Sequence, residues 1–215
     1  SGMTGTGKTE IIQRLPTGLD LEGAANHKGS SFGRPLDEQP AQIDFENRIA
    51  IDLLKIEDQH PQSMVVLEDE SRNIGARHIP HYFADRMAQS QFVVIDMDFD
   101  ERLERLWQEY VVERYLKTMA YFGANGEQAF ANYLRESLLR VQKRLGGQRT
   151  KELMTSMDNA ITVQHQDNFA SHRHWLSLIT KDYYDPMYNY QLDKKKELVV
   201  FRGSREAVIE WLKRG

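Results

Sequence analysis

The first nine residues constrain this chain more than any other stretch, because they contain the pattern of a phosphate-binding loop. The sequence G-M-T-G-T-G-K-T runs from Gly2 to Thr9 and reads as Gly, four residues, then Gly-Lys-Ser/Thr. Glycines let the backbone curl so that successive N–H groups point into one concave nest that binds phosphate oxygens. We therefore predict a P-loop whose phosphate-binding residues are Gly5, Thr6, Gly7, Lys8 and Thr9.

Two side chains of this loop carry specific chemistry. Lys8 is placed to reach a terminal phosphate as a point charge. The Thr9 hydroxyl is placed to ligate Mg²⁺. Residues 9–15 read as a short helix that Pro16 ends. A P-loop ordinarily follows a buried strand, whereas only Ser1 precedes this one, so we expect the first strand to be missing and the chain to be a fragment of a longer protein.

A second phosphate-linked pattern lies about sixty residues further on. The apolar run Met64 to Leu67 is typical of a strand covered on both faces, and it leads into E-D-E-S-R at 68–72. Carboxylates at such a strand end hold Mg²⁺, so Glu68 and Asp69 join Thr9 as predicted metal ligands. Glu70 is either a base or simply solvated. Arg72 binds a phosphate or pairs only with its acidic neighbours.

The segment between these two patterns contains a glycine- and serine-rich loop. Residues 18–22 alternate apolar and polar side chains, as a short strand does. Residues 23–33 then lack periodicity and contain His27, Lys28, Ser30 and Ser31 between glycines. We favour a loop that folds over a bound phosphate, with Ser30 and Ser31 as contacts. The alternative is a plain surface connector.

The rest of the chain alternates helices and strands. Strands are expected at 18–22, 64–67, 92–96 and 197–201, and helices at 43–58 and 75–88. This order predicts an α/β fold, a P-loop NTPase-like parallel sheet with crossover helices, in one domain spanning residues 1–215. A large helical section from about 100 to 180 belongs to it, with a capping box of Asp98 and Glu101 at its start.

The helical section contains a basic span. Arginines and lysines gather between residues 135 and 151, against the single acid Glu136. Three interpretations stay open: a solvated helix face, a nucleotide-clamping lid, or a tract that meets an RNA backbone. Residues 183–190 read as an aromatic loop, which either stacks bases or packs on the helices.

Composition limits the class of protein. The chain has no cysteine, so it contains no disulfide, thiolate metal site or cysteine nucleophile, and a reducing cytoplasmic setting fits. No apolar run approaches a membrane span, so no membrane partner is expected. The net charge of −4 argues against a uniformly basic nucleic-acid binder but leaves a local basic face open.

The motifs together resemble the C-terminal P-loop domain of bacterial tRNA 2-selenouridine synthases. The matching pieces are G-M-T-G-T-G-K-T at 2–9, L-D-L-E-G-A-A-N-H-K-G-S-S-F-G at 19–33 and V-L-E-D-E-S-R-N-I-G at 66–75. The second and third are far more specific than a Walker motif alone. The resemblance covers the whole chain.

The resemblance implies a transferase that acts on the wobble uridine of tRNA. The family converts 2-thiouridine to 2-selenouridine with selenophosphate, through an S-geranyl intermediate made from geranyl diphosphate. The whole enzyme carries an N-terminal rhodanese-like domain with a functional cysteine, and this sequence has neither. The isolated chain is therefore expected to be incomplete for selenation.

The resemblance implies that the P-loop holds the phosphate groups of geranyl diphosphate or selenophosphate, so it need not be an ATP site. Lys8, Asp69 and Glu70 are the predicted catalytic residues, and Mg²⁺ is a possible cofactor. A basic set is predicted to bind the anticodon arm of tRNA, namely Arg77, Arg140, Lys143, Arg144 and Arg149. Two alternatives stay open: an ATP-dependent small-molecule or nucleotide kinase or NTP hydrolase, and a non-catalytic module that docks tRNA.

Overall fold

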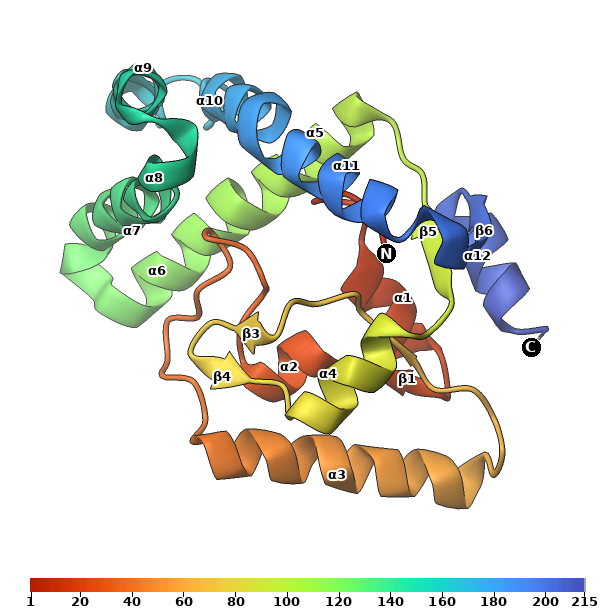
Figure 1. The fold of residues 1–215 in the computed structure, drawn as a ribbon. Coiled ribbons are helices and arrows are strands. Elements are labelled where there is room, and N and C mark those ends of the chain that lie inside the picture. The colour runs from red at the N-terminus through yellow and green to blue at the C-terminus, as the bar shows by residue number, and fades with distance from the viewer. Residues whose placement is uncertain (215) are drawn as a thin grey trace. The chain divides into compact units, whose positions relative to one another are not determined.

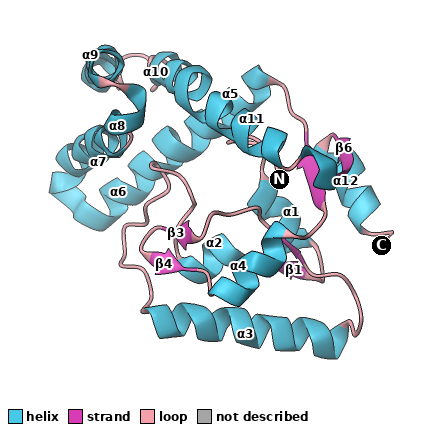
Figure 2. Ribbon diagram, in the orientation of Figure 1, coloured by secondary structure: helices cyan, strands magenta, loops and turns pink. Residues whose placement is uncertain are grey.

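The computed structural model describes residues 1–214, which form two compact units. Unit 1 comprises Ser1–Gly2, Thr6–Met97 and the chain from Leu192 onward. Unit 2 comprises Met3–Gly5 and Asp98–Gln191. Figure 1 follows the chain by colour, and Figure 2 shows that helices dominate both units.

Unit 1 combines short strands with helices. Its elements are α1 (Lys8–Arg14), β1 (Gly18–Leu19), α2 (Leu21–Ala25), α3 (Gln42–Gln59), β2 (Val66–Leu67), β3 (Asn73–Ile74), β4 (Arg77–His78), α4 (His81–Ala88), β5 (Phe92–Ile95), the 3₁₀ turn Lys196–Leu198, β6 (Val199–Gly203) and α12 (Arg205–Leu212). The chain is thus mixed α/β, with more helix than strand.

The strands of unit 1 pair in three separate two-stranded sheets. β1 pairs with β2 in parallel, with Leu19 opposite Leu67. β5 pairs with β6 in parallel, with Ile95 opposite Gly203. Gly2 forms an isolated parallel bridge to Ile95. The prediction of parallel strands with crossover connections is confirmed for these pairs, whereas a single continuous parallel sheet is not what the described residues form.

The strand expected at 18–22 ends early because Asp20 begins a helix. The Asp20 side chain accepts a hydrogen bond from the Gly23 amide at 2.7 Å and so caps α2. Leu21 is fully buried on that helix. The strand expected at 64–67 is also shorter, because β2 contains only Val66 and Leu67. Met64, the first residue of the expected strand, is 51% exposed.

The helix expected over 75–88 is confirmed only from His81. Residues 73–78 instead form the antiparallel β3–β4 hairpin. Its turn requires Gly75, whose φ of 63° is left-handed and whose added Cβ would lie 2.2 Å from the Gln39 side-chain oxygen. Pro80 precedes α4 because a proline needs no amide partner at a helix start.

The core of unit 1 is built around α3, which lies beside α2 in Figure 1. Phe45 is 0% exposed, and Ile49 and Ile56 share its face at helical spacing. This confirms the helix that the sequence predicts for residues 43–58. A second cluster joins α1 to α12 through Ile11 and Val208.

Unit 2 is a helical assembly. Its elements are α5 (Phe99–Trp107), the π-helix Gln108–Glu113, α6 (Arg114–Phe122), the 3₁₀ turn Gly123–Asn125, α7 (Gly126–Arg140), α8 (Gln142–Leu145), α9 (Gly147–Val163), α10 (His172–Ile179), the π-helix Thr180–Tyr184 and α11 (Asp185–Lys194), whose end from Leu192 falls in unit 1. Its core includes Phe130, Leu153 and Trp175, each 0% exposed.

Two local predictions in this region are wrong. Residues 183–190 are helical, because the π-helix continues directly into α11, so no aromatic loop forms there. Asp98 precedes α5 without a side-chain cap hydrogen bond, so the predicted capping box does not form. Among the described residues, no helix is long and apolar enough to cross a membrane.

Candidate functional site

The P-loop backbone has the conformation that a phosphate nest requires. Gly5 and Gly7 have φ values of 86° and 73°, a left-handed region that glycine enters without steric cost. Lys8 Nζ donates to the Gly2 carbonyl at 2.9 Å and thus reaches back along the loop. Thr6 is almost fully buried at 1% exposure. The loop is therefore held in a curled form with its lysine folded over it.

Thr9 contacts a carboxylate that the sequence reading had not singled out. Its hydroxyl donates to Glu22 Oε2 at 2.8 Å. The other carboxylate oxygen, Glu22 Oε1, accepts the Gly29 amide at 2.5 Å. Glu22 on α2 thus connects the P-loop to the glycine- and serine-rich loop.

The glycine- and serine-rich loop is held together by hydrogen bonds between its own backbone groups. The Lys28 amide donates to the Gly33 carbonyl at 3.1 Å, and the Gly33 amide donates to the Ser30 carbonyl at 3.0 Å. Phe32 is 2% exposed and anchors the loop in unit 1. Ser30 and Ser31 are half-buried. Residues 28–33, which we call the serine loop, are thus a compact structure joined to Thr9 through Glu22.

Glu68 is the buried carboxyl at the end of β2. It is 1% exposed, its Oε2 accepts the Leu21 amide at 3.3 Å, and its Oε1 has no hydrogen-bond partner among the described residues. Burial, followed by the charges of Asp20 and Glu22, raises the pKa of Glu68 to about 8. A carboxyl with this pKa is mostly protonated at neutral pH, and a protonated carboxyl is a poor ligand for Mg²⁺.

Asp69 forms an ion pair with a lysine distant in the sequence. Lys195 Nζ donates to Asp69 Oδ1, and both side chains are mostly buried. The Lys195 ammonium also lies 4.6 Å from the centre of the Phe92 ring. The sequence placed Lys195 only in a charged run, with no signal that it would contact the acidic strand end.

Glu70 is the acid whose pKa suits proton transfer near neutrality. Burial raises the pKa of Glu70 to about 7, and the charge of Glu22 raises it further, whereas the charge of Lys8 lowers it. Its carboxyl lies against the serine loop, because a Cβ added to Gly29 would be 2.3 Å from Glu70 Oε2. Gly29 is therefore flanked by the carboxyls of Glu22 and Glu70.

Arg72 lines the same cavity as Glu70 but forms its ion pair with Asp85. Its guanidinium donates to Asp85 at 3.2 Å, in a pair whose side chains are both more than half exposed. The cavity has a volume of about 160 Å³ and is also lined by Lys195. An exposed pair of this kind is worth little energy, so the guanidinium remains available to an anion.

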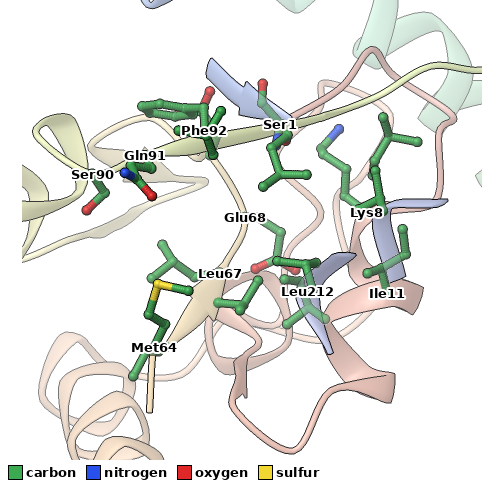
Figure 3. Close-up of a pocket in the computed structure, with 18 of the residues that line it drawn as sticks. Ser1, Lys8, Ile11, Met64, Leu67, Glu68, Ser90, Gln91, Phe92 and Leu212 are labelled. Atoms are coloured by element: carbon green, nitrogen blue, oxygen red, sulfur yellow. The ribbon is translucent and has the colours of Figure 1, made fainter. Parts of the chain in front are cut away.

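A second, mostly apolar cavity lies between the two parallel sheets of unit 1 (Figure 3). Its volume is about 160 Å³, and Lys8 and Glu68 are among the polar side chains on its wall. Most of the wall is apolar and comes from β2, β5, α1 and α12, including Ile11, Leu67, Phe92 and Leu212.

The residues predicted to bind tRNA are not all in one unit. Arg77 belongs to the β3–β4 hairpin of unit 1, whereas the other four belong to unit 2. Arg140 and Lys143 are exposed near the junction of α7 and α8. Arg144 donates to the Tyr183 hydroxyl at 3.1 Å, and Arg149 pairs with Asp182 and Glu152.

The donors present suit Mg²⁺ only if a substrate supplies further ligands. Residues 1–214 contain no group of three His, Cys, Asp or Glu side chains placed to hold a metal ion. Mg²⁺ ordinarily takes one or two protein oxygens together with water and substrate phosphates. The Thr9 hydroxyl and the Glu22 carboxylate beside it can supply the one or two protein oxygens that such a site needs.

The family model and the similar proteins that match this chain carry the same description. A family model described as the tRNA 2-selenouridine synthase AAA domain matches residues 1–215. A tRNA 2-selenouridine synthase of Shewanella frigidimarina is 46% identical over 214 residues, which cover 99% of this chain and 58% of that protein. One from Salmonella enteritidis is 45% identical and is covered to 59%. No solved structure matches the chain.

Proposed function

The chain belongs to the tRNA 2-selenouridine synthase AAA domain family, and on that premise we propose that it is the phosphate-binding transferase part of such an enzyme. It spans just under three fifths of the relatives it matches, so the complete reaction requires the longer protein. The proposed reaction converts wobble 2-thiouridine of tRNA to 2-selenouridine through an S-geranyl intermediate. The rhodanese-like domain and the tRNA are the proposed partners.

One observation carries the proposal: the curled P-loop lies next to a carboxyl with a pKa near neutrality. Gly5, Gly7 and Lys8 supply the groups that hold a diphosphate. Glu70 lies within electrostatic reach of Lys8, which opposes the rise of its pKa. A phosphate holder beside a proton acceptor suits alkylation with a diphosphate leaving group.

The geranyl step can be written so that its atoms balance. The sulfur of 2-thiouridine forms a bond to C1 of the geranyl group while the bond from that carbon to the diphosphate oxygen breaks. The diphosphate leaves with the bonding electrons, and the pyrimidine loses its N3 proton as the thione becomes a thioether. Lys8 and the P-loop amides stabilise the leaving group, and Glu70 accepts the proton. Ser30, Ser31 and Arg72 are the proposed additional phosphate contacts.

The selenium step uses the same phosphate site. The selenium of selenophosphate forms a bond to C2 of the base while the C2–S bond breaks, and the sulfur leaves as geranyl thiol with the selenol proton. Water then cleaves the Se–P bond, which releases inorganic phosphate and returns a proton to N3 of the 2-selenouridine. Mg²⁺, when bound, would neutralise the phosphate charge, with Thr9 and Asp69 as its protein oxygens and Glu68 joining them only when ionised. The anticodon arm is proposed to contact the basic residues Arg77, Arg140, Lys143, Arg144 and Arg149.

We further propose that the fold is a P-loop NTPase-like one. Two observations support this: β1 pairs with β2 and β5 pairs with β6 in parallel, and the start of the P-loop lies beside β5, where the Ile95 amide donates to the Ser1 carbonyl at 3.0 Å and Gly2 bridges Ile95 in parallel.

The function is tested on the full-length enzyme with tRNA that contains 2-thiouridine. With geranyl diphosphate, mass spectrometry of the nucleosides should show S-geranyl-2-thiouridine, and the Lys8→Ala variant should make about 100-fold less. Lys55→Ala, an exposed lysine on α3, is the matched control and should behave as the unaltered enzyme. Equal product from the Lys8→Ala variant would overturn the proposal. ATP hydrolysis without geranyl transfer would favour the kinase or hydrolase alternative.

A further inference from the structure

We infer that Glu22 is a positioning residue that sets Thr9 and the serine loop in a single arrangement for phosphate binding. The inference rests on the proposed function and deepens it, because it concerns how the same site is organised. Glu22 does not itself need to contact the substrate. Its role is to hold two segments that are separate in the sequence.

The first support is the pair of hydrogen bonds that Glu22 makes. One carboxylate oxygen accepts the Thr9 hydroxyl, and the other accepts the Gly29 amide. Both oxygens therefore have a donor, and the two donors come from the P-loop and from the serine loop. Hydrogen bonds to an ionised acceptor are about twice as strong as neutral ones, so this connection is a firm one.

The second support is what this arrangement does to the Thr9 hydroxyl. Because Thr9 donates its only hydroxyl proton to Glu22, the lone pairs of its oxygen are left to face a cation or a phosphate-bound water. A neutral amide at position 22 has one acceptor oxygen and one NH₂ group. The NH₂ group replaces one of the two carboxylate oxygens and cannot accept, so either the Gly29 contact is lost or the Thr9 contact is lost or reversed.

The third support is the tight placement of Gly29. Glu22 holds its amide, and the Glu70 carboxyl occupies the space that a side chain would need. The serine loop is internally closed and anchored by the buried Phe32, so it moves as a compact piece. Fixing Gly29 therefore fixes Ser30 and Ser31, the proposed phosphate contacts.

The start of α2 explains why the Glu22 side chain lies near both Thr9 and Gly29. Asp20 caps α2, and that cap starts the helix at Leu21. Were residues 18–22 a continuous strand, as their alternation suggests, residue 22 would continue along the sheet. The early helix start instead places Glu22 within reach of both Thr9 and Gly29.

The test uses the full-length enzyme, with inorganic pyrophosphate and geranyl diphosphate as probes in the presence of Mg²⁺. Glu22→Gln should weaken binding of both probes about 10-fold, as expected for loss of one charged hydrogen bond. Hydrogen exchange of the amides at 28–33 should become faster. Glu57→Gln, an exposed glutamate on α3, is the matched control and should change neither measurement.

A double-variant cycle separates positioning from general destabilisation. In a Thr9→Val background the Glu22→Gln change should cost much less binding, because its target hydroxyl is already gone. Glu22→Asp keeps the charge but is shorter, so its effect should lie between those of the unaltered enzyme and Glu22→Gln.

The outcomes distinguish this inference from the proposed function. If the unaltered enzyme binds both probes and Glu22→Gln binds them equally well, the inference is wrong and the proposed function stands. Additive losses in the cycle would also overturn it. If the unaltered enzyme binds neither probe, the proposed function fails, and faster exchange at 28–33 in Glu22→Gln would still show that Glu22 holds the loop.

Discussion

Protonation of His172 should destabilise unit 2 as the pH falls from about 8 to about 5. His172 is 0% exposed on α10. Its Nδ1 accepts the indole N–H of Trp175 at 2.9 Å, and its Nε2 lies 3.2 Å from the Gln164 side-chain oxygen. These contacts suit the neutral ring with its proton on Nε2. Burial lowers the pKa of His172 from 6.5 to about 4, while the charge of Asp167 opposes that shift.

The sign and the size of the effect follow from linkage. Because the folded pKa lies below the unfolded value, the unfolded chain binds the proton more readily. Stability is therefore complete above pH 6.5 and is lost as the pH falls toward 4. Between about pH 8 and about pH 5 the loss is about 2 kcal/mol, at about 1.4 kcal/mol per pKa unit. For a chain of this size that corresponds to a drop of about 4–8 °C in melting temperature.

The assay is urea denaturation followed by circular dichroism at both pH values. His172→Asn keeps an acceptor near Nδ1 for Trp175 but cannot titrate, so its loss of stability on acidification should be about 2 kcal/mol smaller than that of the unaltered chain. His174→Asn changes an exposed histidine of the same helix and should retain the full loss. Equal pH dependence for the unaltered chain and His172→Asn would refute the reasoning.

Three further perturbations have defined outcomes. Arg102→Met should lower the free energy of unfolding by about 3–5 kcal/mol in chemical denaturation, because it leaves the Asp185 carboxylate of a buried ion pair uncompensated; an unchanged value would contradict this. Phe45→Ala should cost about 3–5 kcal/mol by the same method, and a loss below about 1 kcal/mol would mean that α3 is not packed as described. Gly29→Ala should weaken pyrophosphate binding in calorimetry, because the new Cβ displaces the Glu70 carboxyl, and unaltered affinity would show that phosphate binding does not depend on where that carboxyl lies.

Local sequence patterns predicted those parts of the fold that depend on local chemistry. The stripe of Phe45, Ile49 and Ile56 identified a buried helix face, since helical periodicity alone determines which side chains share a face. Ser204 is a further case of local chemistry, because a serine is a favoured residue at a helix start and its side chain accepts the Ala207 amide at the start of α12.

Patterns failed where a short-range cap or a turn competed with periodicity. Asp20 ended a strand that alternation had extended to residue 22. The left-handed Gly75 allows a hairpin within the segment 75–88, for which a helix was expected. Residues 183–190 lack an obvious apolar stripe, and their helix follows from its continuity with α10 and the π-helix.

The candidate site was predictable as a set of motifs but not as a set of contacts. The P-loop and the acidic strand end could be recognised because their chemistry is fixed by residue types at short spacing. The partners Glu22 and Lys195 could not, because they come from other elements and only the folded chain brings them to Thr9 and Asp69. The burial that makes Glu68 protonated at neutral pH is likewise a property of the fold.

The central claim is that the P-loop holds the phosphate groups of geranyl diphosphate. Calorimetric titration with geranyl diphosphate and, separately, with ATP, each with Mg²⁺, tests it most directly. The chain should bind geranyl diphosphate tightly and ATP weakly, and Lys8→Ala should abolish the binding of geranyl diphosphate whereas Lys55→Ala should leave it intact. Tight ATP binding with no response to geranyl diphosphate would contradict it.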